Sequence, residues 1–268
     1  MPKIQINDIE LYYEFKGNPD GRTLVFVNGL LTDTSSWNGH LPFFAERYHC
    51  LVYDCRGQGQ SDKPNHVYET AMHAADLAGL VDALGIDRAH FIGLSNGGAA
   101  VLDYAATHPE RVNALVVSGA YAYVDTITRV KLTSWVKAME YGGSPLRFDV
   151  ATPWVWGAEF LETHYEALLP YREKGVNLPI APVANLVRGA MEHDVRALLP
   201  GITAPTLVVV GEDDLLTPPK MARAIAEAAP HGELRVLRDL GHAAALEDVP
   251  GFCQVALEFF ARNEAAGS

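Results

Sequence analysis

The hydrophobic residues of this chain gather in short continuous runs that alternate with stretches of helical periodicity. Residues 23–27, 50–53, 113–117 and 205–210 are mainly apolar, as strands covered on both faces of a parallel sheet are. Between the second and third of these runs, leucine and valine recur at helical spacing over residues 77–84, and Gly85 then ends the helix. Repeated strand, helix, strand units of this kind predict a parallel sheet with right-handed crossovers.

The two ends of the chain follow different patterns. Residues 4–15 alternate between apolar and polar positions around Asn7 and Asp8, which predicts an antiparallel hairpin at one edge of the sheet. Toward the other end we expect a helix near residues 220–229, a short strand over 233–236, and a last helix with one apolar stripe. Residues 263–268 are small and polar, so we expect them to fray.

The alternating pattern is interrupted between about Val124 and Leu199. This stretch has no continuous β-branched run, and its apolar residues recur in helical patterns among several prolines. It predicts a helical cap, residues 124–199, inserted into an α/β core of residues 1–123 and 200–268. The aromatic residues of this cap, some of which we expect in its own core and others at an apolar pocket, are Trp135, Tyr141, Phe148, Trp154, Trp156, Phe160, Tyr165 and Tyr171.

Ser95 stands at the point where a buried strand is expected to turn into a helix. The sequence Gly93-Leu94-Ser95-Asn96-Gly97 follows an apolar run and precedes a helix-forming run. A Gly-x-Ser-x-Gly corner in this setting holds the serine hydroxyl out at the carboxyl edge of the sheet, close to a helix N-terminus, and the corner leaves no room for side chains at the glycines. Ser95 is therefore the candidate nucleophile.

A serine hydroxyl needs a base to take its proton, and the base needs a carboxylate that orients it. Asp213 and Asp214 follow the strand predicted to end at Val210, and His242 follows the strand predicted to end near Val236. Because parallel strands bring their carboxyl ends to one crevice, we expect Ser95, Asp214 and His242 to meet there.

At these residues the chain resembles the α/β-hydrolase family over nearly its full length. The resemblance implies a mostly parallel, eight-stranded type of sheet with an inserted cap, and a triad of Ser95, Asp214 and His242. It also implies that Glu247 anchors the histidine loop and that the segment from Asp54 mostly shapes a loop. The motifs that carry the resemblance are Gly93-x-Ser95-x-Gly97, Gly211-x-x-Asp214 with Pro218, Gly241-His242 with Glu247 and Pro250, and Asp54-x-Arg56-Gly57-x-Gly59-x-Ser61-Asp62.

The resemblance places the two oxyanion-hole donors at the backbone N–H groups of Leu30 and Asn96. The chain departs from most family members here, because Asn28 and Gly29 stand where His-Gly is usual. Asparagine can brace the loop by side-chain hydrogen bonds, which would preserve the oxyanion hole. Asn-Gly at this point also resembles certain carrier-protein 3-hydroxyacyl transferases of the same fold, so an acyl acceptor other than water stays open.

The net charge and the cysteine content limit the kinds of partner and the cellular compartment that we expect. A formal net charge of −12 argues against nucleic acid or an anionic membrane as the main partner. Three cysteines, no secretory signal and no apolar stretch long enough to span a membrane predict a cytoplasmic protein with reduced thiols. We expect a small, apolar acyl substrate, and no cofactor or metal. The oligomeric state is left open.

These observations predict a serine hydrolase that cleaves a carboxylic ester, lactone or thioester through an acyl-enzyme. Within the family, chain length and the loop from Asp54 resemble 3-oxoadipate enol-lactonase-like and carboxylesterase-like members. Two alternatives stay open: an acyltransferase of the same fold, and a binding protein that retains the fold without turnover.

Overall fold

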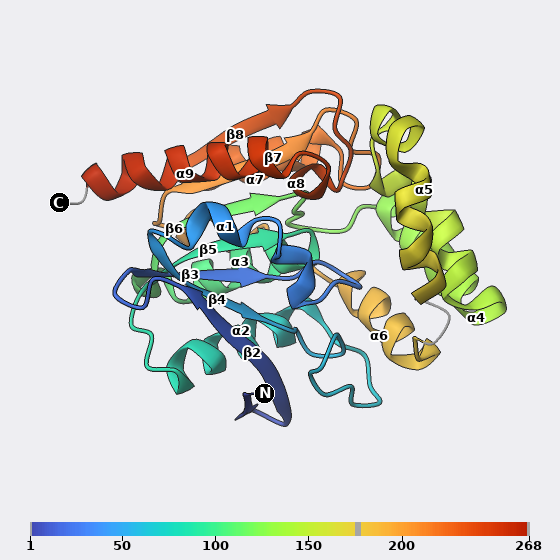
Figure 1. Cartoon of the computed structure of the whole chain (residues 1–268), viewed down its shortest axis with the longest axis horizontal. Coiled ribbons are helices and arrows are strands. Elements are labelled where there is room, and N and C mark those ends of the chain that lie inside the picture. Colours follow the sequence, from blue (N-terminus) through green and yellow to red (C-terminus); the bar gives the residue numbers. More distant parts are fainter. Residues whose placement is uncertain (1, 175–177, 267–268) are drawn as a thin grey trace.

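One eight-stranded sheet organises the molecule (Figure 1). The computed structural model describes residues 2–174 and 178–266. The strands lie in the order β1-β2-β4-β3-β5-β6-β7-β8. Their bounds are β1 Lys3–Ile6, β2 Ile9–Gly17, β3 Arg22–Val27, β4 Tyr48–Tyr53, β5 Ala89–Leu94, β6 Val112–Ser118, β7 Thr206–Gly211 and β8 Gly232–Leu237.

The strand directions confirm the mostly parallel sheet. All pairs from β4 to β8 are parallel. The first two strands form the predicted antiparallel hairpin, and β2 then pairs antiparallel with β4. Asn7 takes a φ of 52° at the turn, a left-handed conformation that asparagine tolerates better than most residues. The carboxyl ends of β3, β5, β6, β7 and β8 therefore meet at one edge of the sheet.

Helices cover both faces of the sheet, so the central strands β3 to β7 are largely buried, as their apolar runs predict, whereas the edge strand β8 is partly exposed. One face packs against α2 (Thr70–Ala83), α3 (Asn96–Thr107) and α7 (Pro219–Ala228). The other packs against α1 (Leu41–Phe44) and α9 (Val249–Ala266), with Phe26, Trp37 and Phe252 in its core. The remaining short helices of the core are η1 (Thr34–Trp37), η2 (Pro109–Arg111), η4 (Leu199–Gly201) and α8 (Ala244–Glu247).

Three helices fill the connection between the neighbouring strands β6 and β7. They are α4 (Thr126–Val155), α5 (Ala158–Lys174) and α6 (Ile180–Ala190). Figure 1 shows these cap helices together at the end of the molecule toward which the parallel strands run. The helix α4 is broken at Gly143, whose φ of 67° only glycine adopts readily. Val195 and Leu199 lie within the predicted cap range, but they pack in the hydrophobic core that the sheet forms with α2, α3 and α7.

The C-terminal tail differs from the sequence expectation of fraying. Helix α9 continues to Ala266, and Glu264 is a hydrogen-bond acceptor for the Tyr48 hydroxyl at 3.0 Å and an ion-pair partner of Arg47. The prediction is wrong for residues 263–266 because polar contacts hold the last turn where no apolar anchor exists. Residues 267 and 268 lie outside the described residues. No helix within residues 2–174 and 178–266 is both long and apolar enough to cross a membrane.

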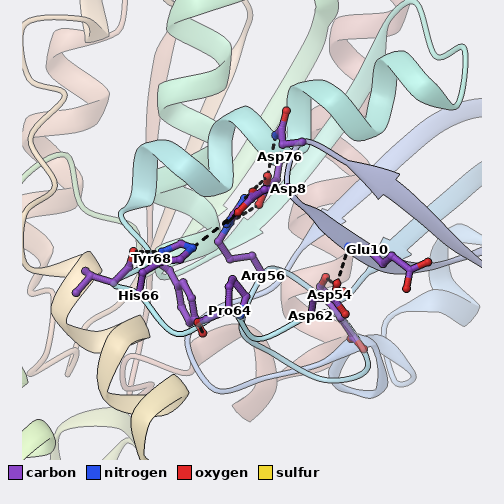
Figure 2. A network of polar contacts seen from close by, with 12 residues as sticks. Asp8, Glu10, Asp54, Arg56, Asp62, Pro64, His66, Tyr68 and Asp76 are labelled. Carbon is purple, nitrogen blue, oxygen red and sulfur yellow. Dashed lines mark hydrogen bonds and ion pairs between the residues drawn. The ribbon is translucent and has the colours of Figure 1, made fainter.

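An ion cluster built on the buried Arg56–Asp76 pair joins the hairpin turn, the loop after β4 and helix α2 (Figure 2). The Arg56 side chain is 2% exposed and donates two hydrogen bonds to Asp76, at 2.7 and 2.8 Å. It also donates to Asp8 at 2.8 Å, and Asn7 donates to Asp76 at 2.9 Å. These contacts fix the start of the loop that continues through Gly57 and Gly59.

We expect Arg56→Met to lower the free energy of unfolding by about 3–5 kcal/mol, because Asp76 would be left as a buried carboxylate without its cation. Urea denaturation measures the change. The control is Arg262→Met, which removes an exposed ion pair with Glu233 and should cost less than about 1 kcal/mol. Equal effects of the two substitutions would contradict a special role for the buried cluster.

Candidate active site

Ser95 lies on the corner between β5 and α3. Its φ of 50° and ψ of −118° are outside the regions that side-chain-bearing residues prefer. A Cβ at Gly93 would lie 2.7 Å from the Gly98 Cα, and a Cβ at Gly97 would lie 2.4 Å from the carbonyl oxygens of Val27 and Asn28. Those distances are too short for any side chain, so the corner requires glycine at both positions that the motif predicts.

The structure brings the three predicted polar residues together. Ser95 Oγ lies 2.9 Å from His242 Nε2, and His242 Nδ1 lies 2.9 Å from Asp214 Oδ2. With Nδ1–H donating to the carboxylate, Nε2 is left to accept the hydroxyl proton of Ser95. The three residues follow β5, β7 and β8, so the parallel sheet positions them at one edge.

Asp214, rather than its neighbour Asp213, faces the histidine. Asp214 is 1% exposed, whereas Asp213 is exposed to solvent. The Oδ1 atom of Asp214 accepts hydrogen bonds from the N–H groups of Leu216 (2.9 Å) and Thr217 (2.7 Å). These backbone bonds fix the carboxylate and leave Oδ2 for the imidazole.

Thr217 is a member of this cluster that the sequence analysis did not identify. Its hydroxyl lies 2.9 Å from Asp214 Oδ2, 3.0 Å from His242 Nδ1 and 2.9 Å from the Gly119 carbonyl oxygen. The available signal was a threonine three residues after an aspartate in a loop, a spacing at which Asp side chains bond the following backbone. Thr217 thus ties the acid loop to the segment after β6.

The loop after β3 lies directly against Ser95. A Cβ at Gly29 would lie 3.2 Å from the Leu94 carbonyl oxygen and 3.5 Å from the Ser95 Cβ. Asn28, 1% exposed, donates from Nδ2 to the Tyr53 carbonyl oxygen at 3.0 Å and accepts at Oδ1 from the Trp37 indole N–H at 2.6 Å. Both ends of the amide are therefore used to hold the loop that carries Leu30.

Asp54 holds the far end of the same loop. Its carboxylate accepts hydrogen bonds from the N–H groups of Thr34 and Gln60, each at 2.7 Å. Burial raises the pKa of this carboxyl group, although the two N–H donors act in the opposite direction. The loop after β4 therefore supports the loop after β3 as well as shaping its own turn.

The histidine loop is tied to the cap helices. The Glu247 carboxylate accepts from the N–H of Gly241, next to His242, and from the N–H of Gly157, between α4 and α5, at 3.1 Å each. The N–H of Ala243 donates to the Val155 carbonyl oxygen at 2.9 Å. The predicted anchor of the histidine loop thus also binds the cap.

An apolar cluster of the cap helices reaches the acid loop. Leu216 packs with Leu132 and Trp135 of α4, and Trp154 and Val155 border the same cluster. Of the predicted cap aromatics, Trp135 and Phe148 are buried, whereas Tyr141, Tyr165 and Tyr171 are exposed. The aromatic residues that pack with Leu216 of the acid loop, Trp135 and Trp154, come from α4.

The arrangement is suited to attack by an activated hydroxyl on an electrophilic carbon. Asn96 is the first residue of α3, so no helix carbonyl accepts its N–H, which stays available beside Ser95. Within residues 2–174 and 178–266, no three His, Cys, Asp or Glu side chains are grouped so that they could share a metal ion.

Known proteins resemble this chain in sequence over nearly its whole length. The family model described as alpha/beta hydrolase fold matches residues 22–249. RutD of Stutzerimonas stutzeri, named provisionally as a carbamate hydrolase, is 30% identical over 262 residues, covering 94% of this chain and 97% of that protein. The 3-oxoadipate enol-lactonase 2 of Acinetobacter baylyi is 29% identical over 245 residues, covering 91% of each.

Solved structures also resemble this chain over nearly its whole length. The enol-lactonase from Burkholderia xenovorans LB400 superposes with a TM-score of 0.88 at 28% identity, covering 97% of this chain and 100% of that one. MGS-M2, an alpha/beta hydrolase enzyme from a Medee basin deep-sea metagenome library, has a TM-score of 0.92 at 26% identity, covering 97% of each chain.

The pH dependence of stability should report the buried state of Glu247. Burial raises the pKa of this carboxyl group above its ordinary value. The folded protein therefore favours the protonated form, and stability relative to Glu247→Gln should fall as pH rises from about 4 through the raised pKa. Urea denaturation at several pH values measures the difference. Glu258→Gln, on the exposed face of α9, controls for the charge change itself. An advantage of wild type that grows with pH would contradict the assignment.

Proposed function

The chain belongs to the α/β-hydrolase fold family, and from this premise we propose that it is a serine hydrolase acting on a carboxylic ester, lactone or thioester. The observation that carries the proposal is the continuous pair of contacts from Ser95 Oγ through His242 to Asp214, each 2.9 Å long. A nucleophile, a base and an orienting acid in this order form the arrangement used for acyl transfer.

In the first half-reaction, Ser95 Oγ bonds to the carbonyl carbon of the substrate while His242 Nε2 takes the hydroxyl proton. The carbonyl oxygen becomes an oxyanion, which the N–H groups of Leu30 and Asn96 stabilise. One such donor is worth about 3 kcal/mol of transition-state stabilisation. As the tetrahedral intermediate collapses, the bond to the leaving group breaks and His242 donates the proton to that group.

In the second half-reaction, water attacks the acyl-enzyme and transfers its proton to His242. The acid product leaves, and Ser95 regains its proton. Asp214 stays ionised throughout and stabilises the imidazolium that forms in each half. These steps use the chain's own residues and require no cofactor or metal.

The names of the relatives make lactones the first class of substrate to test. Two of them, from Acinetobacter baylyi and Burkholderia xenovorans, are named as enol-lactonases and match this chain over more than nine tenths of its length. A carbamate is a further class to include, because RutD is named for it. The cluster of Trp135, Trp154 and Leu216 beside the acid loop supports a small substrate with an apolar acyl part.

Transfer to an acceptor other than water is the weaker alternative. Both ends of the Asn28 amide are bonded to Tyr53 and Trp37, so the residue is committed to bracing the loop rather than to choosing an acceptor. Three buried, unpaired thiols support a reducing, cytoplasmic place of action.

A substrate panel tests the proposal. Wild-type protein is first treated with a fluorophosphonate, which should form a covalent bond to Ser95 Oγ with loss of fluoride. It is then assayed against chromogenic esters of increasing acyl length, lactones, acyl thioesters and carbamates. Absence of labelling at Ser95 together with absence of turnover would favour a binding protein that retains only the fold.

We expect Ser95→Ala and Asp214→Asn each to lower kcat by about 10⁴-fold, because the first removes the nucleophile and the second leaves His242 without its orienting carboxylate. Steady-state kinetics on the best substrate measures both. The matched control is the exposed neighbour Asp213, whose replacement by Asn should change kcat far less. A larger effect at Asp213 than at Asp214 would move the assignment of the acid.

We expect Asn28→Ala to lower kcat by about 10–100-fold at nearly constant KM, since the Leu30 donor would be misplaced mainly in the transition state. Asn28→His should be tolerated better, because an imidazole can also hydrogen-bond across the loop. Single-turnover acylation and the ratio of hydrolysis to transfer, measured on both variants, separate bracing from acceptor choice. A shift in that ratio at unchanged acylation rate would favour the acyltransferase alternative.

A further inference from the structure

The side chain of Asn96 is locked in place by two buried hydroxyl groups. Its Oδ1 atom accepts hydrogen bonds from Thr70 Oγ1 at 3.0 Å and from Tyr121 Oη at 2.7 Å. Asn96, Thr70 and Tyr121 are each no more than 3% exposed. Thr70 begins α2 and Tyr121 follows β6, so two separate segments converge on the residue after the nucleophile.

This lock acts directly beside a residue whose backbone is strained. The peptide between Ser95 and Asn96 carries the N–H proposed as an oxyanion donor, and Ser95 on its other side has a φ of 50° and a ψ of −118°. A residue in such a conformation costs about 1–3 kcal/mol and persists only when its surroundings hold it. Rotation of this peptide would relax Ser95, but it would also move Asn96, whose side chain is fixed.

The second proposed donor shares the same support. Tyr121 forms an apolar cluster with Ala99, Ala190 and Met221, and the Leu30 side chain packs against that cluster. The edge of the Tyr121 ring also meets the His193 ring, with centroids 5.5 Å apart and planes at 88°. The cluster that contains Tyr121 therefore adjoins Leu30, while the Tyr121 hydroxyl bonds to Asn96.

The environment of the two hydroxyls keeps water out of these bonds. Helix α6 lies over Tyr121 through Ala190, and it approaches the start of α2, where the Tyr68 N–H donates to the Asn185 carbonyl oxygen at 3.4 Å. A Cβ at Gly189 would lie 1.9 Å from the Tyr68 carbonyl oxygen, so the helix and this segment are in close contact. Hydrogen bonds shielded in this way are stronger than exposed ones.

We propose that Tyr121 and Thr70 are positioning residues that hold the Asn96 backbone N–H in its oxyanion-binding orientation by anchoring the Asn96 side chain. The inference rests on the proposed function and names two residues that act on its transition state without touching the substrate. The oxyanion charge develops as the transition state is reached and is absent from the bound substrate, so these residues affect kcat rather than KM.

The test compares Tyr121→Phe and Thr70→Val, which remove one hydroxyl each, with Thr70→Ser, which keeps it. Tyr123→Phe is the matched control, because Tyr123 lies two residues from Tyr121 and its ring contacts Arg196 instead of Asn96. For each protein the number of active sites is titrated, and kcat, KM, the rate of Ser95 labelling by a fluorophosphonate and the thermal midpoint are measured.

We expect kcat per titrated site to fall about 5–10-fold in Tyr121→Phe and Thr70→Val, the loss of about one hydrogen bond, with KM within about twofold of wild type. Fluorophosphonate labelling should slow in parallel, because the P=O oxygen occupies the same oxyanion position. Thr70→Ser and Tyr123→Phe should behave as wild type. A merely structural role would lower the thermal midpoint or the number of active sites and leave kcat per site unchanged.

The outcomes separate the two levels of the proposal. If wild type turns over substrate and is labelled at Ser95, but both hydroxyl-free variants match it in kcat per site, the positioning role is overturned and the hydrolase function stands. If wild type is neither labelled at Ser95 nor active on the panel, the proposed function and this inference are both overturned. A parallel loss of kcat and labelling rate, rescued in Thr70→Ser, supports both.

Discussion

The strained backbone of Ser95 is the constraint on which the rest of the structure depends. A residue with a φ of 50° and a ψ of −118° relaxes unless every neighbour opposes the change. The sheet edge fixes it from one side, because the Ser95 N–H donates to the Ser118 carbonyl oxygen at 2.8 Å. Glycines at 93, 97 and 98 let backbones approach closely enough to hold it from the other sides. The loops after β3, β7 and β8 are then arranged around this fixed corner.

The cap helices are attached at two places to the sheet edge that carries Ser95, one on each side of this residue. On the histidine side, Val155 and Gly157 bond to Ala243 and Glu247. On the other side, Ala190 of α6 packs on Tyr121, and the Asn185 carbonyl oxygen accepts from the Tyr68 N–H. The cap helices therefore contact segments on both sides of Ser95.

Much of this arrangement could be predicted from the sequence, because its causes are local. Apolar runs mark the buried strands, and glycines around Ser95 mark a corner that admits no side chains. Asp214 and His242 could be placed since parallel strands end at one edge. Contacts between distant segments left no such signal: Thr70 and Tyr121 meet Asn96 only through the packing of α2, β6 and α6. The tail was misjudged for a related reason, because Glu264 is held by Arg47 and Tyr48, which come from the other end of the chain.

The segment that leads into the insertion and the segment that leaves it are hydrogen-bonded to each other. Tyr123 and Asp194 form an antiparallel bridge, and the Val195 N–H donates to the Ala122 carbonyl oxygen at 2.8 Å. These bonds hold the two ends of the insertion together. The entropic cost of closing a longer insertion grows only slowly with its length. This closure lies outside the cap helices, so the spacing of β6 and β7 does not fix the length of those helices. A transplanted module would need to reproduce the carbonyl of residue 155 and the N–H of residue 157 on one side, and on the other the contacts of residues 185 and 190 with Tyr68 and Tyr121.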